Sequence, residues 1–193
     1  MKLNLSLRVE KEQLETFGFV SQSEKPDFNK AGHIGTHFDV MNKEFSLENI
    51  VTKGNIFDIS NIKSHEVKVE NLDLHRVCQN DFVIFHSGLL KKYGYGTDEY
   101  FSPHMELSDE LIDYLLLDKK VSFIGVDMVG IKGSKDHARI DQYCANNGVF
   151  IIENLDNLDL LLKEAGDKPF TVYTFPLNLH GFTGLPCRVV AEI

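Results

Sequence analysis

Short apolar runs recur along the chain, and polar residues, glycines or prolines bound each of them. Runs of this kind that are rich in β-branched and aromatic residues are typical of strands, and DFVIFH and VSFIGV are clear examples. We predict strands at residues 56–60, 81–86, 121–126, 149–152, 170–175 and 188–193, the last two joined through the turn sequence HGFTGLP.

Three segments between these runs have the features of helices. In residues 108–119, Ser108 can cap the N-terminus, and the leucine and isoleucine side chains of LIDYLL form one apolar face. We predict further helices at residues 136–147, ended by Gly148, and at 157–163. Strands and helices that are intermixed in this way indicate the α/β fold class, and the strand order stays open.

Length, composition and charge restrict the class of protein. The chain has 193 residues, 42% of them hydrophobic and 25% charged, which suits a single domain over residues 1–193. No apolar stretch approaches the roughly 20 residues that span a bilayer, and the N-terminus lacks the apolar core of a signal peptide, so we expect a cytoplasmic protein. A net charge of −9 argues against nucleic acid or a membrane as a partner.

The cysteines Cys78, Cys144 and Cys187 are far apart and odd in number, and the chain has no CxxC motif. A disulfide framework or a thiolate zinc site is therefore not expected, and we predict three reduced thiols.

The stretch HIGTHFD places two imidazoles and a carboxylate at alternate positions. In an extended chain, His33, His37 and Asp39 share one face, while the apolar and β-branched residues between them face the core. His37 and Asp39 are then roughly 6–7 Å apart at Cα and can converge on one ion. His33 can join them only if the chain bends at Gly35, because a straight strand would hold it roughly 13 Å from His37. The alternative is a half-buried strand whose polar residues face solvent, but we favour a metal site.

A metal site needs a further ligand from elsewhere in the chain. Glu153 follows the apolar run VFII, so its carboxylate lies beside the core, where it is costly unless it is paired or bound to a metal. Asp127 has the same placement after VSFIGV and is the second choice. The alternative for Glu153 is that it faces solvent or caps the following helix.

These residues form a recognisable family pattern. HIGTHFD resembles the HxGTHxDxPxH motif of the bacterial kynurenine formamidase and "putative cyclase" family, which includes isatin hydrolase. The segments NDFVIFHSG followed by KYG, FIGVDMVGI, GVFIIENLDNL and FPLNLHGFTGLPCRVVA also resemble blocks of that family. The resemblance covers most of the chain and implies a swivelling β/β/α fold, a homo-oligomer (dimer or tetramer) and a small-molecule substrate.

The resemblance also implies a hydrolytic site with one or two divalent ions, zinc or manganese. His33, His37 and Asp39 match the first metal ligands of the family, and Glu153 matches a later carboxylate ligand. Asp39 and Glu153 would bridge the ions if two are bound. The remaining family ligand is a histidine, and Asp141 stands at its position. Carboxylates also bind zinc and manganese, so we predict Asp141 as a ligand, and His137, one helical turn earlier, is an alternative.

The chain departs from the family motif where a proton-shuttling histidine is expected. Lys43 stands at that position, and Met41 replaces the motif's proline. A buried Lys43 could act as a base, an accessible one could bind an anionic substrate or stabilise an oxyanion, and a solvated lysine beside Glu44 is equally compatible. The early aromatic contact of the family has no clear counterpart, and Phe17 and Phe19 are the nearest substitutes.

His104, in SPHMELS, resembles a family position near the site, although it could also be an ordinary loop residue. The predicted function is hydrolysis of an amide-type C–N bond, in a formamide or a cyclic amide, by metal-activated water. Glu153, Lys43 or His104 would move the protons. The alternatives are a family member that binds a metal and a small ligand without turnover, or a lyase or cyclase on the same scaffold.

Overall fold

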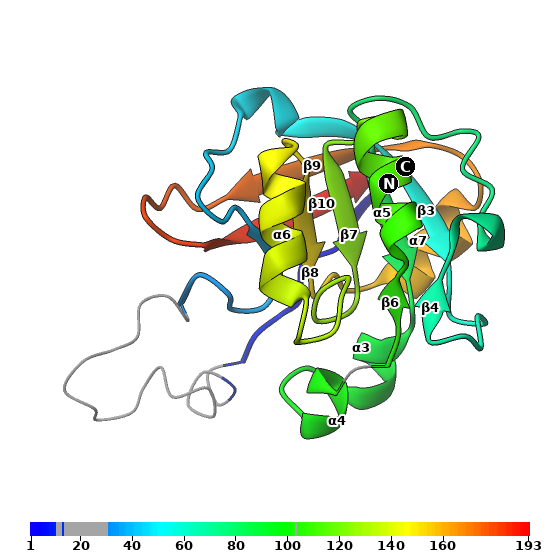
Figure 1. Ribbon diagram of the computed structural model, residues 1–193, viewed down its shortest axis with the longest axis horizontal. Coiled ribbons are helices and arrows are strands. Elements are labelled where there is room, and N and C mark those ends of the chain that lie inside the picture. Colours follow the sequence, from blue (N-terminus) through cyan, green and yellow to red (C-terminus); the bar gives the residue numbers. More distant parts are fainter. Residues whose placement is uncertain (11–12, 14–30, 103) are drawn as a thin grey trace.

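The predicted strands assemble into one large sheet in a computed structural model of the chain, which describes residues 1–10, 13, 31–102 and 104–193 (Figure 1). Phe17 and Phe19, the suggested aromatic contacts, lie outside the described residues. The sheet contains β1 (Lys2–Asn4), β2 (His37–Asp39), β3 (Val51–Asp58), β5 (Phe82–His86), β7 (Phe123–Val126), β8 (Phe150–Glu153), β9 (Phe170–Pro176) and β10 (Gly184–Glu192).

The strand order is β1-β10-β2-β8-β7-β5-β3-β9, and β9 also pairs with β10, so the sheet closes into a barrel. Strands β3, β5, β7 and β8 run parallel, and antiparallel pairings join them to β2, β9 and β10. The long strand β10 makes the closure, because its first residues pair with β2 along one edge and the remainder pairs with β9 along the other. β1 pairs with the end of β10, which brings the two termini together (Figure 1).

Helices and short elements occupy the connections between these strands. Among the described residues, the α-helices are α3 (Leu89–Tyr93), α4 (Asp98–Phe101), α5 (Asp109–Asp113), α6 (His137–Asn146) and α7 (Leu158–Ala165), and η3 (Tyr114–Lys119) is a π-helical continuation of α5. The 3-10 turns are η1 (Leu47–Asn49) and η2 (Val69–Asn71), and β4 (Glu66–Val67) pairs in parallel with β6 (Glu106–Leu107). No helix among the described residues is both long and apolar enough to cross a membrane.

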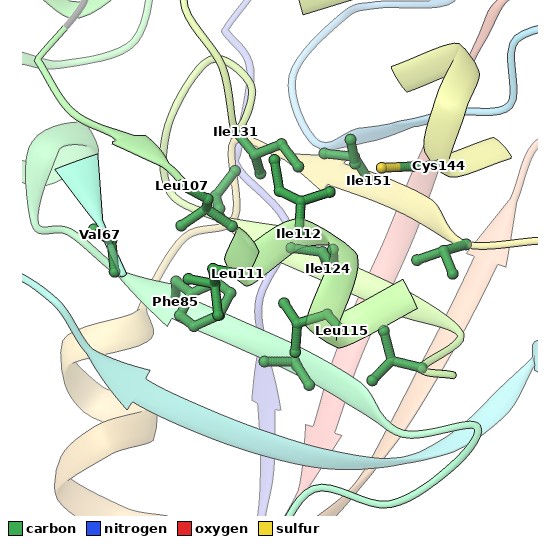
Figure 2. Close-up of a cluster of buried hydrophobic side chains, with 14 of the residues drawn as sticks. Val67, Phe85, Leu107, Leu111, Ile112, Leu115, Ile124, Ile131, Cys144 and Ile151 are labelled. Atoms are coloured by element: carbon green, nitrogen blue, oxygen red, sulfur yellow. The ribbon is translucent and has the colours of Figure 1, made fainter. Parts of the chain in front are cut away.

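Two hydrophobic cores lie on the two faces of the sheet. The outer core, shown in Figure 2, packs α5, η3 and α6 against β5, β7 and β8, with Phe85, Ile124 and Ile151 as sheet residues. The barrel core lies on the opposite face of these strands, where Ile84, Phe123 and other side chains alternate with those of the outer core and α7 contributes its buried leucines. Each central strand is therefore buried on both sides, as its near-continuous apolar sequence requires.

The predicted α/β class is confirmed, with differences in where elements begin and end. The predicted helix 108–119 is α-helical only as far as Asp113 and then becomes the π-helix η3. The turn sequence HGFTGLP was predicted to lie outside the strands, but β10 already begins at Gly184. The reason is tertiary: residues 184–186 pair with β2, which a local turn signal cannot reveal. Cys78, Cys144 and Cys187 are free thiols, as expected.

Candidate metal centre

Strands β2 and β8 place the first residues of the site. His37 is the register partner of Glu153, and Asp39 is the partner of Ile151. Side chains alternate along a strand, so Phe38 enters the barrel core while His37, Asp39 and Glu153 face α6 on the opposite side. All three of these polar residues are buried. Their common face is the one that the alternating sequence HIGTHFD predicts.

His33 reaches the same place because the chain bends. Gly35 has φ of 59°, and β2 does not begin until His37. His33 Nδ1 then lies 3.1 Å from His37 Nε2 and 3.1 Å from Asp39 Oδ1. A Cβ atom at position 35 would be 2.6 Å from Val9 Cγ2, so both the conformation and the space favour glycine. The predicted bend at Gly35 is confirmed.

Helix α6 brings two further ligand-type side chains to β8. His137 and Asp141 are one turn apart on the helix, and His137 Nε2 lies 3.2 Å from Asp141 Oδ2. The same nitrogen is 3.2 Å from Glu153 Oε1. His137 and Asp141 were predicted as alternatives, but the structure brings both to the cluster. The spacing of four residues in a helix was the signal that could have indicated both.

The backbone at Gly130 is part of this packing. Gly130 has φ of 79°, a conformation that L side chains rarely adopt. A Cβ atom there would lie 2.4 Å from His137 Cε1 and 3.3 Å from Glu153 Oε1. Only glycine therefore allows the chain to pass this closely behind the His137 ring.

The donor set fits a divalent cation. One ligand atom each from His33, His37 and Asp39 lie within 4.8 Å of one another, and the same is true of Asp39, His137 and Asp141. Asp39 thus belongs to both groups. Nitrogen and oxygen ligands of this kind suit zinc and manganese.

Burial of these carboxylates is costly without a cation. Asp39, Asp141 and Glu153 are only 2–3% exposed. No described residue donates a hydrogen bond to Asp39 Oδ2 or Asp141 Oδ1, and Glu153 Oε1 contacts His137 without being aligned for a hydrogen bond. A bound dication would offset the cost of burying these charges so close together.

The titration behaviour of the cluster reflects the same crowding. Burial, reinforced by the nearby Glu153 charge, raises the pKa of Asp39. Burial and the Asp39 carboxylate raise the pKa of Asp141 to about 8. Direct contact with Glu153 raises the pKa of His137 to about 9, whereas burial lowers the pKa of His37.

A cavity of about 100 Å³ reaches the cluster at His137 and Gly130. Its walls also include His104, Tyr100, Met105 and Met128. The His104 ring stacks on Tyr93 at 4.5 Å, and its Nε2 atom lies 2.6 Å from the carbonyl oxygen of Glu99. The predicted residue His104 therefore lies in the wall of a cavity that leads to the predicted ligands.

Two other predicted residues are placed differently. Asp127, the second choice as a ligand, accepts hydrogen bonds from the Ser87 backbone N–H and hydroxyl and from the Gly88 N–H. It holds that turn and does not join the cluster, so its selection as a ligand was wrong. Lys43 follows the turn at Met41 and has an exposed side chain. It therefore lacks the burial that a role as a base would require.

Comparisons with known proteins identify a family and a fold. A family model described as "Putative cyclase" matches residues 3–132. A potential metal-dependent hydrolase with cyclase activity has a similar structure, with a TM-score of 0.71 and 19% identity over 99% of this chain and 96% of its own. Isatin hydrolase A from Ralstonia solanacearum gives a TM-score of 0.73 and 16% identity over 99% and 91%.

A predicted metal-dependent hydrolase from Bacillus stearothermophilus is similar to the same extent, with a TM-score of 0.69 and 18% identity over 99% of this chain and 97% of its own. No curated protein matches the sequence. At these identities the likeness shows the fold, and the fold expected from the motifs is confirmed.

Proposed function

The chain belongs to the cyclase family, and from that premise we propose that it is a metal-dependent hydrolase of an amide-type C–N bond, in a formamide or a cyclic amide. The observation that carries the proposal is that the buried Asp39 belongs to two groups of ligand-type side chains. The names of the structural neighbours, a metal-dependent hydrolase and an isatin hydrolase, support the choice of reaction.

We assign His33, His37, Asp39, Asp141 and Glu153 to hold one or two ions of zinc or manganese, with His137 beside them. Asp39 belongs to both groups, which supports a role in holding both ions if two bind. A bound divalent ion would lower the pKa of a water molecule and polarise the substrate carbonyl. Glu153 spans the cluster, with Oε2 3.5 Å from His37 Nε2 and Oε1 3.2 Å from His137 Nε2.

The remaining roles follow from the position of each side chain relative to the cavity and to solvent. Glu153 Oε1 is a carboxylate oxygen close to the cavity residues His137 and Gly130, and we assign it to accept a proton during the reaction. His104 is assigned to the wall against which the substrate binds. The exposed Lys43 is assigned to attract an anionic substrate, with no part in proton transfer. A small molecule suits a cavity of about 100 Å³, and a homo-oligomer in the cytoplasm stays a prediction.

The proposal is tested by metal content and turnover together. Protein purified with added zinc or manganese should contain near-stoichiometric metal by elemental analysis and should hydrolyse a member of a panel of formamides, cyclic amides and lactones. A His37→Ala/Asp39→Ala double variant should lose both properties, because it removes two buried ligands from one strand.

The matched control is His75→Ala/Asp73→Ala, which removes a contacting histidine–aspartate pair from an exposed turn. This control should keep its metal and its activity. Metal content that is unchanged in the His37/Asp39 variant would contradict the ligand assignment. A wild type that binds metal but turns over none of the panel would instead favour a binding protein on the same scaffold.

A further inference from the structure

The residue after Glu153 connects the metal-site loop to the rest of the fold. Asn154 is buried and has φ of 56°, a conformation that asparagine tolerates better than most residues. We propose that Asn154, oriented by Tyr100, is a positioning residue that holds the His37 imidazole with its proton on Nδ1 and its Nε2 lone pair toward the ion. This inference rests on the proposed metal site but requires no particular reaction.

The carbonyl group of Gly35 determines which nitrogen of His37 carries the proton. Its oxygen lies 2.9 Å from His37 Nδ1 and 2.9 Å from Asn154 Nδ2. A carbonyl oxygen can only accept hydrogen bonds, so His37 must present an N–H at Nδ1. In a neutral imidazole the other nitrogen then carries the lone pair, and His37 Nε2 is the atom that faces Asp39 and Glu153.

The same carbonyl group also determines the orientation of the Asn154 amide. Because Gly35 O accepts, the NH₂ group of the amide must face it, and Oδ1 points the other way. Oδ1 accepts a hydrogen bond of 2.7 Å from the Tyr100 hydroxyl. Burial raises the pKa of Tyr100, so this hydroxyl keeps its proton and remains a donor.

The backbone of Asn154 also forms a hydrogen bond with the loop that carries His33 and His37. Its carbonyl oxygen accepts a hydrogen bond of 2.7 Å from Thr36 Oγ1, and its N–H donates to Met128 O. Gly35 and Thr36 are therefore both bonded to one residue at the end of β8. The bent loop that delivers His33 and His37 cannot shift without breaking these bonds, and partners of this kind commonly tune metal affinity.

The test compares Asn154→Gly and Tyr100→Phe with a matched control. Glycine keeps the positive φ while it removes the amide, and phenylalanine removes only the hydroxyl that orients the amide. The control is Asn157→Gly, because Asn157 also has a positive φ, of 58°, and donates from Nδ2 to a carbonyl, that of Asn4, away from the site.

Two readouts decide the inference. Long-range ¹⁵N–¹H spectra of chelator-treated wild type should show His37 protonated at Nδ1, and both test variants should show a mixture of tautomers. Zinc affinity should fall by about 10- to 100-fold in both test variants and stay unchanged in Asn157→Gly.

The inference is overturned if His37 carries its proton on Nε2 in the wild type, or if both variants keep the Nδ1 tautomer and the wild-type Kd. An equal loss of affinity in Asn157→Gly would also overturn it, because the effect would then be one of general stability. If the wild type binds neither zinc nor manganese, the proposed function fails, and the tautomer of the metal-free protein decides this inference by itself.

Discussion

At the residue scale, the site depends on a few side chains whose burial sets their roles. Asp39 and Glu153 are almost inaccessible and lie among imidazoles, as metal ligands do. Lys43, which stands where the family motif has a histidine, is exposed on a turn. A cation there can act on a substrate at long range, but a proton-transfer role would require it to be desolvated beside the reacting atoms.

Lys43→Ala tests this distinction. We expect kcat to stay within about 2-fold of the wild type, because an exposed lysine contributes no general acid–base catalysis. KM for an anionic substrate should rise, and its dependence on salt should flatten, because the long-range attraction is lost. Steady-state kinetics at two ionic strengths measure both effects, with the exposed Lys168→Ala as the control. A fall in kcat of about 10²–10⁴-fold with metal retained would identify Lys43 as the proton-transfer group.

At the scale of elements, local signals place helix starts well and strand ends less well. Ser108 caps α5, as predicted, because its Oγ accepts a hydrogen bond of 3.1 Å from the Leu111 N–H. The following change from α5 to the π-helix η3 keeps Leu115 and Leu116 buried in the outer core. Packing against the sheet therefore matters more for this segment than regular helical geometry does.

Ser108→Ala should lower the free energy of unfolding by about 1–2 kcal/mol, because the cap bond is lost in a fully buried setting. Urea unfolding in excess chelator measures this change without a contribution from metal binding. The control is Ser46→Ala, which removes the cap of the exposed turn η1 and should cost less than about 0.5 kcal/mol. Equal losses in the two variants would contradict the importance of the buried cap.

At the scale of the whole molecule, the barrel core packs against the face of β2 that lies opposite the proposed ligands. The Phe123 ring lies 5.2 Å from Phe82, 6.3 Å from Phe38 and 6.4 Å from Phe150, measured between ring centroids. Phe38 lies between His37 and Asp39 in sequence, so the aromatic cluster anchors β2 from the face opposite the ligands. Stability of this core and precision of the site are therefore linked.

Phe123→Ala should destabilise the protein by about 3–5 kcal/mol, through lost apolar burial and the cavity that remains. That is a large share of the roughly 5–15 kcal/mol that stabilises a typical domain. Chemical denaturation of metal-free protein measures it, with Leu47→Ala as the control because Leu47 is 76% exposed. A loss below about 1 kcal/mol would mean that the closed sheet does not depend on this cluster.

The sequence by itself determined what is local. Alternation along HIGTHFD put His37 and Asp39 on one face, Gly35 indicated the bend that brings in His33, and the end of an apolar run indicated Glu153. These inferences succeed because side-chain direction in a strand and the conformational freedom of glycine depend on neighbouring residues alone.

Only the tertiary structure decided what depends on distant segments. The pairing of β2 with β8 and the packing of α6 over them put both His137 and Asp141 at the cluster, where the sequence offered them as alternatives. The tertiary structure also decided three other features. β10 starts early, at Gly184, Asp127 accepts a hydrogen bond from Ser87, and Lys43 is exposed. The choice of strand partners and the packing of helices on the sheet arise from contacts between residues far apart in the chain, and periodicity along one segment does not identify those partners.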